Sequence, residues 1–137
     1  RANVVPAEAR ATIDARASTR ADADRVERAM KALVPHLAGA QVTITGGFDR
    51  PPLERTDRVV RLFQAARAVA EDLGLTLEEG SAGGGSDGNF TAALGIPTLD
   101  GFGAIGDGAH ALHEHVAIDA LAPRAAVIAG LLARLAR

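Results

Sequence analysis

The sequence predicts a fold that mixes helices and strands, α/β in the broad sense and α+β in arrangement. Two observations lead to this prediction. Short stretches of alternating apolar and polar residues, typical of strands, take turns along the 137 residues with longer stretches whose apolar residues recur every three or four positions. A segment rich in glycine and proline, from Gly46 to Pro52, marks a boundary inside the chain. We therefore expect a small β-α-β unit at residues 1–47 and a larger part at residues 48–137.

The first unit is predicted to contain a strand, a helix and a second strand. Residues 4–15 alternate loosely and include β-branched side chains, as in a half-buried strand. Ser18 or Thr19 can cap a helix that Pro35 ends or kinks. Residues 41–45 alternate again and predict the second strand. The apolar residues at helical spacing in the helix are Val26, Met30, Leu33 and Leu37.

The larger part is predicted to begin with an amphipathic helix from Thr56 to Gly74. Strands are expected at residues 75–79 and 96–99, with a helical segment over residues 87–94 between them. A final helix has the clearest apolar stripe, which needs a sheet or another helix to cover it. Its apolar residues are Ile118, Leu121, Ala125, Ile128, Leu132 and Leu135.

The composition argues against several classes of function. The net charge is −2, the arginines are dispersed and aromatic residues make up 3% of the chain, so no nucleic-acid partner and no membrane partner is expected. No apolar run is long enough to span a bilayer. Because the chain has no cysteine, any metal must be bound by histidine and carboxylate side chains. The sequence starts without Met or a signal-peptide pattern, which predicts a processed or truncated chain; the compartment stays open, with the cytoplasm favoured.

A glycine-rich run with the sequence SAGGGSDGNF allows three interpretations. Gly83, Gly85 and Gly88 fit the dinucleotide fingerprint G-x-G-x-x-G, but the preceding segment is polar at its end and is separated from the glycines. In a second interpretation the glycines permit a tight turn, and Ser86 or Asp87 caps the next helix.

The third interpretation of the glycine-rich run is a nucleophile elbow. Residues 84–88 fit G-x-S-x-G, with Ser86 as nucleophile, Asp100 or Asp107 as acid and then His110, in the required chain order. An elbow should follow a buried apolar strand, however, and 137 residues are few for a complete α/β-hydrolase sheet. A serine hydrolase therefore stays as an alternative function.

Three of the four histidines, His110, His113 and His115, lie in one loop together with Glu114. Imidazoles beside a carboxylate are typical of a metal or hydrolytic site. We expect His113 and His115 to be solvated, whereas His110 lies among small residues with Glu114 near enough to orient it. His110 alone does not make a zinc site, because stable zinc binding takes three or four protein ligands.

Together these segments resemble the C-terminal part of the zinc-dependent aminoacylase and carboxypeptidase family, which includes glutamate carboxypeptidase, acetylornithine deacetylase and succinyl-diaminopimelate desuccinylase. Residues 3–6 followed by residues 14–16 are similar to its N-[IV]-[IV]-P…D-x-R strand. Residues 83–87 are similar to its G-G-G-[ST]-D loop, and residues 108–110 with Glu114 are similar to its G-x-H…E loop. The order and spacing of the three motifs carry the resemblance over the full length.

The resemblance implies a fold for each part of the chain and a cofactor. Residues 1–47 would be part of a ferredoxin-like lid and dimerisation domain, and residues 48–137 the C-terminal portion of a zinc-exopeptidase catalytic domain. His110 would be the last protein ligand of a two-zinc centre, for which cobalt or manganese are alternative metals.

The resemblance also implies substrate contacts. Asn3 and Arg16 match lid residues that contact the substrate, where the arginine grips a carboxylate by two oxygens at once. Gly85 would offer its backbone to the substrate, and Arg50 is predicted to be a second carboxylate contact. The implied substrate is a small amide that carries a carboxylate.

The function implied by the resemblance is that of a zinc-dependent metallohydrolase, either an exopeptidase or an N-acyl amino acid deacylase. In the intact enzyme two zinc ions lower the pKa of a bridging water, and a glutamate takes the proton. This sequence has no counterpart of that glutamate, of the bridging aspartate or of the lid histidine donated across the dimer. We therefore expect no catalytic residue in this chain and no hydrolysis by the chain alone. The expected partners are a second copy in a homodimer or a separate N-terminal catalytic piece, and the alternative is a non-catalytic binding or assembly module.

Overall fold

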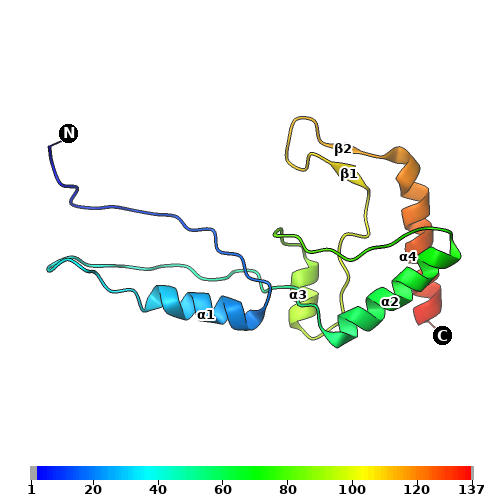
Figure 1. Cartoon of the computed structure of the whole chain (residues 1–137), viewed down its shortest axis with the longest axis horizontal. Coiled ribbons are helices and arrows are strands. Elements are labelled where there is room, and N and C mark those ends of the chain that lie inside the picture. Colours follow the sequence, from blue (N-terminus) through cyan, green and yellow to red (C-terminus); the bar gives the residue numbers. More distant parts are fainter. Residues whose placement is uncertain (1–2, 137) are drawn as a thin grey trace.

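The computed structural model describes residues 3–136 and combines four α-helices with one small sheet, as an α+β fold does. The ends of both predicted domains, at residues 1–2 and 137, lie outside the described residues. Figure 1 shows α1 and two extended segments on one side, and α2, α3, α4 and the sheet on the other. In chain order the elements are α1 (Arg20–Lys31), α2 (Asp57–Asp72), α3 (Gly88–Ala93), β1 (Gly106–Asp107), β2 (His115–Val116), the 3-10 helix η1 (Ile118–Ala120) and α4 (Leu121–Leu135).

Helix α1 begins where the sequence predicts and ends earlier. The Thr19 hydroxyl accepts a hydrogen bond from the backbone N–H of Asp22 at 3.1 Å, which confirms the predicted cap. The helix ends at Lys31, so Leu33 lies outside it and is exposed. A proline disfavours helical backbone in the residue before it, so Pro35 limits how far the helix can extend past Leu33.

The two strands predicted beside α1 are wrong. Residues 4–15 and 41–45 are extended, but neither segment is a strand, and neither shares a backbone hydrogen bond with another part of the described chain. Figure 1 shows both running lengthwise beside α1. An alternating sequence favours extended backbone, whereas a strand also needs a neighbour whose N–H and C=O groups complete the ladder. No described segment supplies that neighbour.

The strands predicted in the larger part are also wrong, and a different sheet forms. Residues 75–79 and 96–99 are irregular and lack ladder partners within the described range. Instead, β1 and β2 pair antiparallel, with Gly106 opposite Val116 and Asp107 opposite His115. The pairing closes the histidine loop at its base (Figure 1). Glycine and aspartate are poor strand formers, which is why sequence patterns gave no sign of this sheet.

Helices α2 and α4 pack against each other and hold most of the core. The Thr56 hydroxyl accepts a hydrogen bond from the Val59 N–H at 3.3 Å, and α2 stops before Gly74, as predicted. Gly74 has φ +70°, a left-handed conformation that glycine adopts without strain. The buried residues of the two helices are Ala66, Val69, Ala70 and Val127.

The predicted stripe on the last helix is not covered in this structure. All six of its residues are exposed, with Leu132 at 63% and Leu135 at 57%, and the residue that α4 buries is Val127, which lies outside the predicted stripe. The accessible surface is 11050 Å² for a mass of 14.0 kDa, against about 6,700 Å² for a typical folded monomer of that mass. Much apolar surface therefore faces outward. No helix between residues 3 and 136 is long and apolar enough to cross a membrane.

Candidate functional site

Two arginines hold the glycine-rich loop at residues 83–87, one from each predicted part of the chain. Arg16 Nη1 donates to the carbonyl oxygen of Gly83 at 3.1 Å. Arg50 Nη1 donates to the carbonyl oxygen of Ser86 at 2.5 Å. The structure thus brings together three of the residues or segments that the sequence singled out, through backbone carbonyls of the loop.

Arg50 lies against the loop along its whole side chain. Its guanidinium carbon is 4.8 Å from the centre of the Phe90 ring, a cation-π distance, and Nη1 is 3.6 Å from the Asp87 carboxylate. A Cβ atom added to Gly85 would collide with Arg50 Cδ. Glycine at position 85 therefore makes room for the arginine in this structure.

Asn89 is a residue of this site that the sequence analysis missed. Its Oδ1 accepts a hydrogen bond from the Ser86 N–H at 2.8 Å, and its Nδ2 donates to the Pro51 carbonyl at 2.7 Å. Asn89 thereby ties the glycine loop to the segment that carries Arg50. The available signal was an asparagine three residues after a serine, a spacing at which asparagine often bonds to nearby backbone.

Ser86 occupies a turn in this loop. Its hydroxyl accepts a hydrogen bond from the N–H of Gly88, the first residue of α3, at 3.1 Å, which fits the turn of the second interpretation; Asp87, the N-cap residue, makes no side-chain cap hydrogen bond. The described chain has no strand before Ser86, and no hydrogen bond links Ser86 to a histidine. The local setting of a nucleophile elbow is therefore missing from the described residues.

Arg16 is also held by its own segment. Its Nε and Nη2 donate to one oxygen of Asp14, at 3.2 and 2.7 Å. This hydrogen bonding and the positive charge of Arg16 lower the pKa of Asp14 below its ordinary value. The Arg16 side chain is still 62% exposed, which leaves guanidinium surface for a ligand. Asn3 is exposed, and Figure 1 shows the beginning of the chain far from α3 and the glycine loop.

The histidine loop lies between β1 and β2 and is exposed. His110 has φ +67°, and no other non-glycine residue in the described chain has a positive φ. Its backbone N–H donates to Glu114 Oε2 at 3.2 Å. The ring of His115 has a different partner, because its Nδ1 lies 3.0 Å from the His113 carbonyl oxygen.

The described residues do not form a complete metal site. No group of three or more His, Cys, Asp or Glu side chains within residues 3–136 could hold an ion together. His110 is exposed on a loop whose backbone is held by a carboxylate, which fits the part of a single ligand. A zinc site at His110 would need further ligands.

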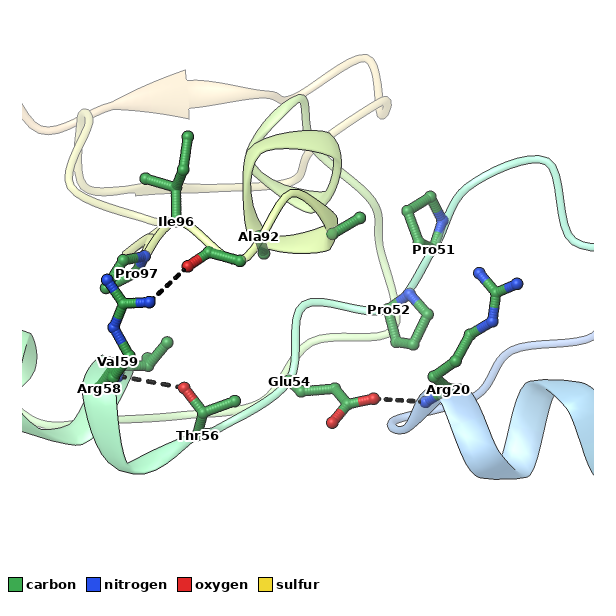
Figure 2. Close-up of a pocket in the computed structure, with 12 residues that line it drawn as sticks. Arg20, Pro51, Pro52, Glu54, Thr56, Arg58, Val59, Ala92, Ile96 and Pro97 are labelled. Carbon is green, nitrogen blue, oxygen red and sulfur yellow. Dashed lines mark hydrogen bonds between the residues drawn. The ribbon is translucent and has the colours of Figure 1, made fainter.

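A cavity of about 380 Å³ lies where α1 meets the larger part of the chain (Figure 2). Glu54 Oε1 accepts a hydrogen bond from the backbone N–H of Arg20 at 2.6 Å, and Arg58 Nη1 donates to the Gly95 carbonyl at 2.9 Å. Its lining is mostly apolar and includes none of the predicted site residues. The cavity therefore adds none of the predicted residues to the candidate site.

Comparison with known proteins decides the family. A model of peptidase family M20/M25/M40 matches residues 5–134. The chain belongs to this family. The resemblance inferred from the three motifs is thereby confirmed.

The relatives of the chain within the M20/M25/M40 family include desuccinylases. A succinyl-diaminopimelate desuccinylase of Stenotrophomonas maltophilia is 32% identical over 120 residues, which are 87% of this chain and 31% of that protein. A succinyl-diaminopimelate desuccinylase of Thioalkalivibrio sulfidiphilus is 37% identical over 71 residues, 52% of this chain and 19% of that protein. The chain thus spans less than a third of the length of these relatives. No solved structure matches the chain significantly.

Proposed function

We propose that the chain is the C-terminal part of a metal-dependent hydrolase that cleaves an amide bond in a small substrate carrying a carboxylate. The observation that carries the proposal is the match to peptidase family M20/M25/M40 over residues 5–134. The similarity to succinyl-diaminopimelate desuccinylases favours an N-acyl amino acid, such as an N-succinyl compound, over a larger peptide.

In this proposal His110 supplies one ligand to a zinc centre, with cobalt or manganese as alternatives. When bound, the metal would polarise the amide carbonyl and lower the pKa of a water molecule. Two features of His110 support its part: the left-handed backbone and the carboxylate that binds its N–H. Uncommon backbone conformations of this kind cluster at functional sites because the surroundings must hold them.

The substrate carboxylate is assigned to the first part of the chain. Arg16 is charged and its side chain is 62% exposed. Its Nη2 is bonded to Asp14, so the guanidinium is oriented before a ligand binds. Asn3 is a second contact in the proposal, and Gly85 offers backbone groups. Arg50 is the other candidate for this contact, although its Nη1 is already bonded to the glycine loop.

The chain is proposed to work in association with further polypeptide, either a second copy or an N-terminal catalytic piece. The excess of exposed surface over that of a typical monomer supports this, as does the uncovered part of α4. Residues 1–47 would then belong to a ferredoxin-like lid, in which the extended segments beside α1 find their ladder partners. A cytoplasmic location fits a hydrolase without cysteine.

The proposal is tested by complementation. The purified chain is mixed with the N-terminal portion of the Stenotrophomonas relative, and zinc-dependent hydrolysis of N-succinyl-diaminopimelate and of N-acetyl amino acids is measured. We expect activity in the mixture, its loss with His110→Ala and its retention with His113→Ala, the matched control from the same loop. Equal activity of the two variants would contradict the role of His110.

The chain alone is the second arm of this experiment. We expect it to release no amine from either substrate at any zinc concentration. Hydrolysis by the chain alone that survives a chelator and stops after fluorophosphonate labelling of Ser86 would replace the metal proposal by a serine hydrolase.

A further inference from the structure

We propose that Arg50 is a positioning residue that fixes the glycine loop at residues 83–87, and that it does not bind the substrate carboxylate. The inference rests on the proposed function only in naming what the loop serves, because the contacts themselves are independent of any ligand. Arg50 would thus act on the site through the conformation of the loop.

The first reason is that the guanidinium is already engaged. Nη1 bonds to the Ser86 carbonyl, the guanidinium plane lies near the Phe90 ring, and Asp87 partly balances the charge. The side chain is 38% exposed, against 62% for Arg16. A carboxylate that used Nη1 for a two-point contact would compete with the Ser86 carbonyl for that donor, and the Phe90 ring and Asp87 already lie against the same guanidinium.

The second reason is the fit between Arg50 and Gly85. The aliphatic stem of Arg50 fills the space that a side chain at position 85 would need. Gly84, its neighbour in the same loop, has nothing within 4 Å of an added Cβ. The loop is therefore shaped around the arginine at one position and open at the next.

The third reason is that the loop has a second attachment next to Arg50. Asn89 bonds to Ser86 and to Pro51, the residue after Arg50, which Figure 2 shows next to Pro52 on the chain leading into α2. Because Asn89 holds this second connection, loss of Arg50 should loosen the loop without unfolding the chain. The effect of a substitution is therefore local and measurable.

The test is a double-mutant cycle on the full 137-residue chain. Amide hydrogen exchange of Ser86 and Gly88 is measured by NMR, because the Ser86 N–H bonds to Asn89 Oδ1 and the Gly88 N–H bonds to the Ser86 hydroxyl. We expect Arg50→Ala to speed their exchange about tenfold, since a hydrogen bond from a charged donor to the loop is lost. Arg50→Lys should fall near Arg50→Ala, because an ammonium lacks the planar fork that meets the carbonyl and the ring together.

The second substitution in the double-mutant cycle is Gly85→Ala. We expect Gly85→Ala to speed the same exchange in the presence of Arg50 and to add little in the Arg50→Ala background, so that the two effects are not additive. Gly84→Ala is the matched control and should leave exchange within about twofold of the parent chain, since its Cβ meets open space. Additive effects of Gly85→Ala and Arg50→Ala would overturn the proposed fit.

Succinate is the probe that separates positioning from binding. If Arg50 positions the loop, succinate added to the chain leaves the Arg50 Nε–H resonance in place, and the Ser86 and Gly88 exchange rates stay unchanged. If succinate shifts that resonance while Arg50→Ala leaves exchange unaffected, Arg50 is a carboxylate contact and the proposal fails. Neither readout requires hydrolysis, so failure here is distinct from failure of the proposed function.

Discussion

Glu114 Oε2 accepts a hydrogen bond from the backbone N–H of His110, whose φ of +67° places it in the left-handed region. For a residue with a Cβ atom this conformation is unfavourable by about 1–2 kcal/mol, and the penalty is smaller for residues that are not β-branched. The carboxylate offsets part of that cost by binding the N–H that the turn directs outward. The orientation of His110 therefore depends on a residue four positions further along the chain.

The left-handed backbone of His110 leads to a prediction about which residues can replace it. His110→Asn should keep the stability of the chain within about 0.5 kcal/mol, because asparagine tolerates this region. His110→Val should lower the free energy of unfolding by about 1–2 kcal/mol, because a β-branched residue does not. Urea denaturation followed by circular dichroism gives both values, and equal stability of the two variants would contradict the assigned backbone.

The same loop predicts a difference between two glycines. A Cβ on Gly108 would lie 2.7 Å from His113 Cδ2, and the residue has φ +72°. Gly108→Ala should therefore destabilise the chain by about 1–3 kcal/mol and shift the ring resonances of His113. Gly103→Ala is the matched control, since nothing lies within 4 Å of its added Cβ. Comparable losses in urea denaturation would argue against the packing of His113 on Gly108.

The contact between α2 and α4 predicts a third effect. A Cβ on Gly130 would lie 2.5 Å from Val69 Cγ1, so the helices would have to separate. Gly130→Ala should cost about 1–3 kcal/mol of stability by overpacking. Combining it with Val69→Ala should cost less than the sum of the single changes, because the smaller residue makes room. Additive losses in denaturation experiments would mean that the two residues do not touch.

The helices could be predicted from the sequence because their limits depend on nearby residues. Thr19 and Thr56 cap α1 and α2 by bonding to N–H groups three positions ahead, and Gly74 ends α2 in a conformation that suits glycine. The strands predicted at residues 4–15 and 41–45 were wrong for the opposite reason. A strand depends on a pairing partner elsewhere in the chain, which an alternating sequence does not identify.

The candidate site shows the same division between local and distant information. Sequence motifs singled out the glycine loop, Arg16, Arg50 and His110 as separate pieces. They did not indicate that the two arginines bind carbonyls of that loop, 67 and 36 residues away along the chain. Asn89 has a local contact with Ser86 three residues away, but its contact with Pro51 exists only once the two segments meet. The chemistry of a residue can be read locally, whereas its partner follows from the fold.

The ion pair between Arg55 and Glu79 leads to a prediction about pH. Arg55 donates to both oxygens of Glu79, at 3.0 and 2.7 Å, joining the start of α2 to the segment that precedes the glycine loop. The hydrogen bonds first, and then the positive charge, hold the pKa of Glu79 below its ordinary value of 4.5. A lowered folded-state pKa contributes stability that is present above the unfolded value and is lost as pH falls through the folded value.

We therefore expect Arg55→Gln to raise the pKa of Glu79 toward 4.5 and to reduce the loss of stability between neutral and acidic pH. Arg67→Gln is the matched control, because Arg67 acts on Glu79 only through a weaker charge effect and should move its pKa less. Titration of the Glu79 side-chain carboxyl carbon by NMR gives the pKa in each variant. The stability effect should be small, since both side chains are largely exposed and exposed ion pairs contribute little. A Glu79 pKa that does not rise in Arg55→Gln would show that the pair does not form in solution.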